Sequence, residues 1–109
     1  MTTLIIKSFG IKNGPGPKAY DCMRLPNPYN TDMRRKTGLE LEVQVYVAKN
    51  EMAMGILARA EVELLREGAV HFACYGGKHR SVAMAEVLGR RMRPKGHKVE
   101  IEHRDLPPR

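Results

Sequence analysis

Apolar side chains recur along the chain at two spacings, and these spacings predict most of its elements. Residues 2–9 are rich in β-branched and apolar side chains and predict a strand. Helical spacing over 50–67 and over 80–93 predicts two helices. The short apolar run at 69–74 predicts a buried strand, and the alternation over 97–106 predicts a final one.

The pattern is weaker between the first strand and the first helix. Residues 12–17 (KNGPGP) predict a turn by their Gly and Pro content, and residues 18–25 predict a second strand. Residues 26–38 contain prolines, Asn and Asp, which favour irregular structure. An irregular stretch of this length in a small domain is typical of a functional loop.

Spacing within the two helices also selects the side chains expected to face the core. The methionines at helical spacing are interpreted as core residues, because Met fills irregular apolar gaps. The predicted core positions are Met54, Leu57, Ala58, Val62 and Leu65 in the first helix, Met84, Ala85, Leu88 and Met92 in the second, and also Met52.

This order of elements predicts an α/β fold. We expect residues 1–109 to form one small single-domain sandwich with a mixed sheet. The last strand-helix-strand unit is expected to be a right-handed crossover between parallel strands. Ligands of such sheets bind beyond the carboxyl ends of the strands. The topology therefore places residues 74–81, between the buried strand and the last helix, at the expected binding site.

Composition indicates an ordinary globular chain of 109 residues, with 42% hydrophobic and 28% charged residues. No apolar run approaches the roughly 20 residues that cross a bilayer. The start, MTTLIIKSFG, has no basic region followed by a long apolar one, so no signal peptide is expected. Cys22 and Cys74 are far apart in sequence and do not suggest a disulfide framework. We therefore expect a cytoplasmic protein.

The net charge is +7, and its placement is uneven. Residues 1–39 and 68–109 are each net positive, whereas residues 40–67 are net negative. If the two ends fold together, they make one basic face that attracts phosphates, nucleotides or nucleic acid. Charge alone is equally compatible with a solvated surface.

The loop at 74–81 combines three features of an anion site. Two adjacent glycines let the backbone turn sharply and approach a ligand closely. The loop opens a helix, whose first N–H groups lack intrahelical partners. Three cationic side chains and a hydroxyl follow the glycines, so phosphate binding is favoured over a turn whose charges face water. The candidate binding residues are Cys74, Tyr75, Gly76, Gly77, Lys78, His79, Arg80 and Ser81.

A second interpretation of this loop is catalytic. Cys74 and Arg80 are spaced C-x5-R, as in the loop of cysteine-dependent phosphatases, where a thiolate attacks phosphorus. Cys74 would then be the nucleophile. That chemistry also needs an acid to protonate the leaving group. Sequence does not place the candidate acids, which are Asp21, Asp32 and Asp105.

Five segments together carry a family resemblance. The stretch GGKHRSVAMAEVL, residues 76–88, resembles GGKHRSV-x-IAE-x-L of the RapZ family, in its C-terminal domain. KSFGIKNG at 7–14, D-x-x-x-LPNP at 21–28, R-x-x-TGL at 34–39 and HRDL at 103–106 follow the family's order. The resemblance spans nearly the whole chain.

The resemblance implies an α/β domain with a regulatory or adaptor role. In the best-studied members it binds small regulatory RNAs, presents them for cleavage by an endoribonuclease and senses glucosamine-6-phosphate. It therefore implies a pocket for a phosphorylated small molecule, with RNA phosphates as competitors, and a homo-oligomer. No Walker loop, G-x-x-x-x-G-K-[ST], occurs in these 109 residues, so nucleotide hydrolysis of that type is not implied. Besides the loop, the site residues that carry over are Asp21, Asn27, Arg34 and Thr37.

The sequence departs from the family at three places, two of them within the pattern D-V-R-F-LPNP-H. Arg24 is shifted by one position, which in a strand puts it on the opposite face. Tyr29 replaces the usual His, and Tyr75 stands where a small hydroxyl residue is usual. The anion loop is retained, so a phosphate ligand is still implied, but the particular amino sugar is not.

Three functions are therefore carried forward. The first is a phosphate-ligand binding module, for a ligand such as a phosphosugar or a nucleotide. The second is an RNA-binding protein that makes phosphate contacts, since aromatic residues for base stacking are few. The third is the phosphatase. The candidate RNA contacts are Lys78, Arg80, Arg34, Arg35, Lys36, Arg90, Arg91 and Arg93.

The histidines differ in what their positions predict. His71 lies within an apolar strand and is expected to be structural, whereas His79 lies in the loop and is expected to contact the ligand. For His103 both roles stay open. We expect no cofactor and no metal, because Cys22 is not at a ligand spacing from any other candidate.

Overall fold

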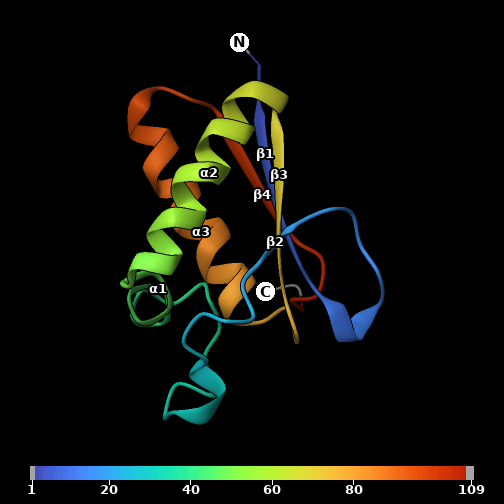
Figure 1. Ribbon diagram of the computed structural model, residues 1–109, viewed down its shortest axis with the longest axis vertical. Helices are drawn as coiled ribbons and strands as arrows, with labels where there is room; N and C mark the ends of the chain where they lie inside the picture. Colours follow the sequence, from blue (N-terminus) through green and yellow to red (C-terminus); the bar gives the residue numbers. More distant parts are fainter. Residues whose placement is uncertain (1, 108–109) are drawn as a thin grey trace.

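The computed structural model describes residues 2–107 as two layers, a parallel sheet with helices on one face (Figure 1). Three short 3-10 segments, η1 (Ile11–Asn13), η2 (Pro28–Asn30) and η3 (Arg93–Lys95), lie in the connections. The strands and helices are β1 (Leu4–Gly10), β2 (Tyr20–Asp21), α1 (Leu41–Ala48), α2 (Glu51–Glu67), β3 (Ala69–Cys74), α3 (Arg80–Met92) and β4 (Val99–His103).

The described sheet has the strand order β2-β3-β1-β4, and each neighbouring pair is parallel. In the central strand β1, Ile6 is the register partner of both Val70 and Ile101. The predicted α/β fold is confirmed, but the sheet is parallel rather than mixed. Each connection carries the chain back to the end of the sheet at which the previous strand began, so all strands run in the same direction. Helix α3 connects β3 to β4, and β1 lies between these two strands in the sheet. That this crossover is right-handed stays a prediction.

Helix α3 forms the centre of the core, where it packs against β1, β3 and β4 and against both other helices. The four core positions predicted for it, Met84, Ala85, Leu88 and Met92, are all buried. A Cβ at Gly89 would lie 2.5 Å from Ile101 Cδ1, so α3 packs closely against β4 and a side chain there would require the Ile101 side chain to move. The register of α3 against the sheet is therefore specified by close packing, and its first turn is held at the edge of the sheet.

The core face of α2 differs from the predicted one. Only Leu57 of the five predicted positions is buried, whereas Met54, Val62 and Leu65 are exposed, as is Met52. The buried side chains are Ala53, Ile56, Leu57, Ala60 and Leu64. Both sets repeat at three- to four-residue intervals, so periodicity alone does not choose between the two faces.

Two segments were wrongly or incompletely predicted. The strand expected over 18–25 is reduced to the two residues of β2. Helix α1 was not predicted, because its β-branched residues alternate with polar ones. It buries Val43, Gln44 and Val47, a helical spacing, against α3, so tertiary packing overrides the local preference.

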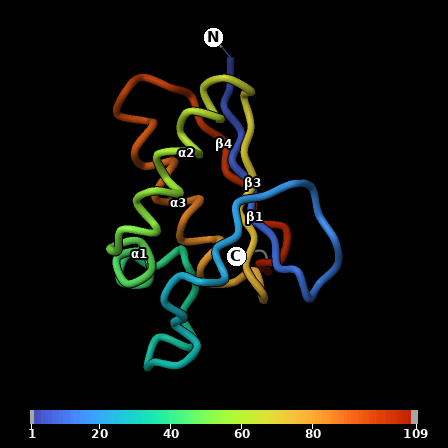
Figure 2. The backbone as a smooth tube through the Cα atoms, viewed as in Figure 1, coloured from blue at the N-terminus to red at the C-terminus, as the bar shows by residue number. Residues whose placement is uncertain are grey.

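The two faces of the sheet are covered differently. All three helices lie on one face, and the segment that follows β1 lies beside the other (Figure 2). His71 is half-buried on this second face; burial, with the nearby Lys7, lowers its pKa. Within residues 2–107, no helix has both the length and the apolar character needed to cross a bilayer.

Candidate functional site

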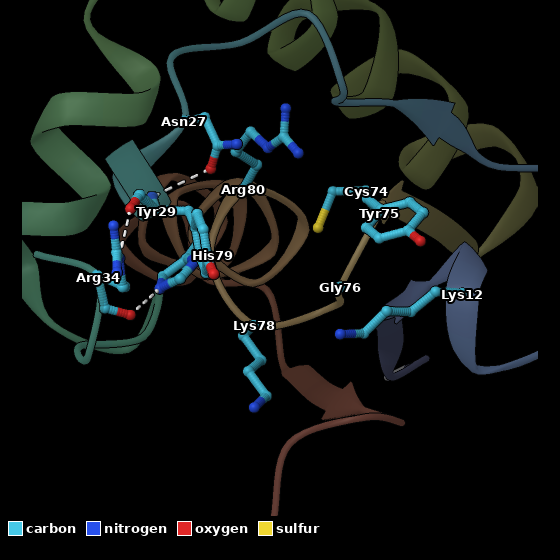
Figure 3. A pocket seen from close by; sticks show the side chains of 10 residues that line it. All are labelled: Lys12, Asn27, Tyr29, Arg34, Cys74, Tyr75, Gly76, Lys78, His79 and Arg80. Carbon is cyan, nitrogen blue, oxygen red and sulfur yellow. Dashed lines mark hydrogen bonds between the residues drawn. The ribbon is translucent and has the colours of Figure 1, made fainter. Parts of the chain in front are cut away.

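The candidate site lies at the carboxyl ends of β1 and β3. The connection that leaves β1 runs beside one face of the sheet to β2, and the connection that leaves β3 enters α3 on the other face (Figure 2). A cavity of about 440 Å³ lies at this edge (Figure 3). Its lining residues are Lys12, Asn27, Tyr29, Arg34, Cys74, Tyr75, Gly76, Lys78, His79 and Arg80.

The cavity wall carries only positive charge. Its lining includes four Lys or Arg side chains and one His, and no Asp or Glu. Such a lining raises the local concentration of anions. The arrangement fits a ligand that carries a phosphate or a similar group.

Arg80 is the most buried of the cationic side chains in the wall, with 9% of its surface exposed. Its Nη1 donates a hydrogen bond to the backbone oxygen of Met23 at 2.5 Å. Within the part of the chain that the structure describes, no carboxylate forms an ion pair with Arg80. A buried charge without a counter-charge is costly, so this guanidinium favours the entry of an anion.

The two glycines of the loop have different roles. Gly77 has φ of 74°, and a Cβ there would lie 2.6 Å from the nitrogen of Gly10. A Cβ at Gly10 would lie 2.3 Å from the carbonyl carbon of Gly76. The end of β1 and the loop are therefore in direct backbone contact. Gly76 has open space, its nearest neighbour being the side chain of Lys12 at 3.9 Å, and it faces the cavity.

Cys74 lies at the start of the loop and is held by hydrogen bonds within it. Its Sγ lies 3.1 Å from Ser81 Oγ and accepts a hydrogen bond from the Gly77 N–H at 3.3 Å. Ser81 is fully buried and lies behind the thiol rather than in the cavity wall. Burial raises the pKa of the neighbouring Cys22 thiol, so Cys22 stays protonated.

The TGL segment supports the opposite side of the loop. The Gly38 N–H donates to the Lys78 carbonyl oxygen at 2.9 Å, and a Cβ at Gly38 would lie 2.2 Å from the nitrogen of Ala83. Gln44 donates to the Gly38 carbonyl oxygen at 2.8 Å. Thr37 is used within its own turn, where its hydroxyl donates to Glu40 at 2.9 Å. These contacts press the segment against the first turn of α3.

The HRDL segment supports the turn that carries Lys12. Arg104 donates to the carbonyl oxygens of Gly10 at 3.1 Å and Pro15 at 2.8 Å. Asp105 accepts a hydrogen bond from the Gly10 N–H at 2.6 Å. This motif therefore orders one wall of the cavity without lining it.

His103 is a structural residue. Its Nδ1 lies 2.6 Å from Ser8 Oγ, and its Nε2 lies 2.7 Å from a carboxylate oxygen of Glu86. Both ring nitrogens are thus occupied, and the side chain joins β1, β4 and α3. These contacts support the structural role of the two that the sequence left open.

Replacing Asp105 with Asn is expected to destabilise the protein at neutral pH and much less in acid. Burial alone would raise the pKa of Asp105, but hydrogen bonds from Arg104 and Gly10 outweigh it and the pKa is lowered. A lowered folded-state pKa gives stability that is present above the unfolded-state pKa and is lost as the pH falls through the folded one. We expect a loss of about 1–2 kcal/mol in the free energy of unfolding at pH 7.

Urea unfolding at pH 7 and pH 3 measures this difference. The gap between wild type and Asp105→Asn should shrink in acid, and an equal gap at both pH values would contradict the assignment. Asp32→Asn is the matched control, because Asp32 is exposed.

Most of the predicted site residues meet at the cavity. Of those outside the wall, Gly77 and Ser81 support the loop, Thr37 supports a turn, and Asp21 is exposed, with its carboxylate accepting from the Met23 N–H at 2.8 Å. The predicted residues that do line the cavity are Asn27, Arg34, Cys74, Tyr75, Gly76, Lys78, His79 and Arg80.

Lys12 and Tyr29 were missed as wall residues. The Lys12 N–H donates to the Tyr75 carbonyl oxygen at 3.0 Å, a contact that follows from the parallel pairing of β1 with β3. That pairing was the one signal that would have placed Lys12 beside the loop. The sequence marked Tyr29 only as a departure from the family pattern, in which His is usual at this position.

The basic residues proposed as RNA contacts do not form one continuous surface. Arg90, Arg91 and Arg93 lie at and just beyond the far end of α3, about 15–20 Å along the helix axis from its first residue. Each has a protein partner: a glutamine, a glutamate and a backbone carbonyl, respectively. Arg35 and Lys36 are exposed on the loop before α1.

Comparison with known proteins identifies the family of the chain. The family defined as the RapZ C-terminal domain matches residues 2–107. The chain belongs to this family. Similar proteins include the nucleotide-binding protein PPA0813 of Cutibacterium acnes, 40% identical over 93% of this chain and 40% of that protein. A nucleotide-binding protein of Fervidobacterium nodosum is 39% identical over 91% of this chain and 40% of that protein.

This RapZ-type chain spans about two fifths of the length of these relatives. The resemblance predicted from its motifs is confirmed over nearly the whole chain. The motifs have distinct structural roles: the GGKHRS segment forms the loop and the start of α3, while TGL and HRDL support the two sides of that loop. Among residues 2–107, no three His, Cys, Asp or Glu side chains gather into a possible metal site.

Proposed function

We propose that this RapZ-type domain binds a phosphorylated small molecule in the cavity and acts as a regulatory module through that binding. The observation that carries the proposal is the buried Arg80 guanidinium, which lines the cavity without a carboxylate partner in the described chain. Hydrogen bonds between a guanidinium and a phosphate are charge-assisted and directional. An anion in the cavity would supply the missing counter-charge.

The surrounding residues support the same ligand class. Lys78 is exposed at the rim and would meet the phosphate on entry. The backbone of Gly76 is accessible, and the first turn of α3 presents the positive end of its dipole. The name of the relatives, nucleotide-binding proteins, is compatible with a phosphate-bearing ligand, although this chain covers only part of them.

Thermal unfolding in the presence of candidate ligands tests the proposal. The panel pairs each phosphosugar and nucleotide with its unphosphorylated counterpart and includes short RNAs. A ligand at 100 times its Kd stabilises the folded state by about 2.7 kcal/mol, which raises the Tm by roughly 10 °C in a domain of this size. Equal Tm values with phosphorylated and unphosphorylated members of every pair would contradict the proposal.

RNA phosphates are the second candidate ligand. Lys78, Arg80 and Arg34 gather at the cavity, and this supports local phosphate contacts. The partnered arginines at the far end of α3 add little to such a surface. In the same panel, stabilisation by short RNAs but by no small phosphate would favour this second candidate.

The phosphatase is the third hypothesis, and we expect it to fail. Cys74 and Arg80 both line the cavity, but none of the lining residues is a carboxylic acid that could protonate a leaving group. We therefore expect no turnover of an aryl phosphate, and we expect Cys74→Ser to leave phosphate affinity within about threefold, since Ser81 can still hydrogen-bond the new hydroxyl. Turnover that is lost in Cys74→Ser would contradict this expectation.

A further inference from the structure

Two tyrosine side chains stand in the wall of the cavity. Tyr29 comes from η2 and Tyr75 from the loop after β3, and their side chains are 56% and 58% exposed. They are half of the four tyrosines in the chain. Large aromatic surfaces that remain open beside a cavity gain contact area only when a ligand covers them.

Each of the two rings is paired with a cation. The Arg34 guanidinium lies over Tyr29 at 4.6 Å from the ring centre, and Lys12 Nζ lies 5.9 Å from the centre of Tyr75. Figure 3 shows Tyr29 beside Arg34 and His79 on one side of the cavity, and Tyr75 above Lys12 on the other. Both sides therefore combine a planar apolar surface with positive charge.

The Tyr29 side is tied to the anion loop. Arg34 Nε donates to the Tyr29 carbonyl oxygen at 2.9 Å, and His79 Nε2 lies 2.9 Å from the Arg34 carbonyl oxygen. Asn27 Oδ1 accepts from the Tyr29 N–H at 3.1 Å. The side-chain amide nitrogen of Asn27 can donate a hydrogen bond to a polar atom of a ligand.

These observations restrict the part of the ligand that lies beyond the phosphate. A ligand with a free ammonium group would meet cations and no carboxylate in the wall. A neutral planar ring avoids this repulsion and stacks well on Tyr and on Arg guanidinium planes. The volume of about 440 Å³ lies within the range of small-molecule and cofactor sites.

We propose that the cavity binds a nucleoside phosphate, with the phosphate at Arg80 and Lys78 and the base stacked on a tyrosine of the wall. This inference rests on the proposed phosphate-binding function and adds the chemical class of the ligand. A free nucleotide and one nucleotide of an RNA chain share this chemistry. The scarcity of other aromatic residues limits the site to a single base.

Calorimetric titration with AMP and ribose 5-phosphate tests the inference, because the two ligands differ only by the base. We expect AMP to bind roughly 5- to 150-fold more tightly, the range measured for stacking of one base on an aromatic side chain. Tyr29→Ala or Tyr75→Ala, whichever removes the stacking ring, should lower AMP affinity by that factor and leave ribose 5-phosphate unchanged. The matching Tyr→Phe variant should retain AMP affinity.

The outcomes separate this inference from the function on which it rests. Equal affinities for AMP and ribose 5-phosphate, or AMP affinity unaffected by both alanine variants, would overturn the nucleoside assignment and leave phosphate binding intact. Absence of binding by AMP, ribose 5-phosphate and inorganic pyrophosphate would overturn the proposed function itself. The last ligand in the titration is an RNA tetramer of adenylate. Tighter binding than AMP would identify RNA as the natural ligand, and weaker binding would identify a free nucleotide.

Discussion

Arg80→Ala is expected to reduce the affinity for a phosphate ligand by roughly 100-fold or more. Arg80 is the buried cation of the cavity wall, and it has no carboxylate partner in the described chain. Hydrogen bonds to a charged group contribute about 1.5–3 kcal/mol each, and a factor of ten in affinity corresponds to about 1.4 kcal/mol. Isothermal calorimetry with the best ligand of the thermal panel measures the effect.

Three further variants show whether the loss is specific. Arg80→Lys retains the charge without the planar fork and should give an intermediate loss. Lys78→Ala alters an exposed side chain, leaves the fold unchanged and should lower affinity by about tenfold. Arg91→Ala, at the far end of α3, is the control and should have no effect on binding. Arg80 also donates a hydrogen bond to the Met23 carbonyl oxygen, so urea unfolding of each variant shows whether stability has changed as well. Unaltered phosphate affinity in Lys78→Ala and Arg80→Lys would contradict the account.

Gly10→Ala is expected to destabilise the fold by about 3 kcal/mol or more. The new methyl group would lie 2.3 Å from the carbonyl carbon of Gly76 and 2.4 Å from the nitrogen of Gly77, and both are backbone atoms. Overpacking of this kind forces backbone shifts that cost 1–3 kcal/mol and sometimes more. The loop would move away from β1, so ligand binding should be lost with stability.

Two other glycines provide matched controls. Gly76→Ala adds a methyl group where the nearest heavy atom is 3.9 Å away, and we expect a change in the free energy of unfolding of less than about 0.5 kcal/mol. Gly55→Ala lies within α2 beside the end of the Arg59 side chain, and it should stabilise the protein by about 0.5–1 kcal/mol. Urea unfolding of the three variants measures the order of their stabilities. Equal stability of Gly10→Ala and Gly76→Ala would contradict the backbone contact between β1 and the loop.

Much of the fold could be predicted from the sequence. The apolar run of β3, bounded by Gly68 and by the glycine loop, had one interpretation, and so did the helix that follows it. Helix α2 has two apolar faces, and either could have been the buried one. Only packing against the sheet decides that Ile56 and Leu64 are buried while Val62 is exposed. Helix α1 and the parallel sense of the whole sheet depend on tertiary packing, which local patterns do not contain.

The candidate site was predictable where its residues are consecutive in sequence or belong to the family motifs, as Asn27 and Arg34 do. Gly76 to Arg80 carry the chemistry of an anion loop in their order alone. Lys12 joins them only because β1 pairs in parallel with β3, and Tyr29 only because its loop folds back against the same edge. The supporting roles of Gly38 and Asp105 likewise became evident from contacts between distant segments.

An NMR titration of the isotopically labelled chain with inorganic pyrophosphate tests the central claim most directly. The account predicts saturable changes in the amide signals of residues 76–81 and of Lys12, and in the Arg80 side-chain Nε–H signal. The same titration of Lys78→Ala should saturate at about tenfold higher concentration. Changes confined to residues 90–98, at the opposite end of α3, or no saturable change at all, would contradict the claim that this loop forms an anion site.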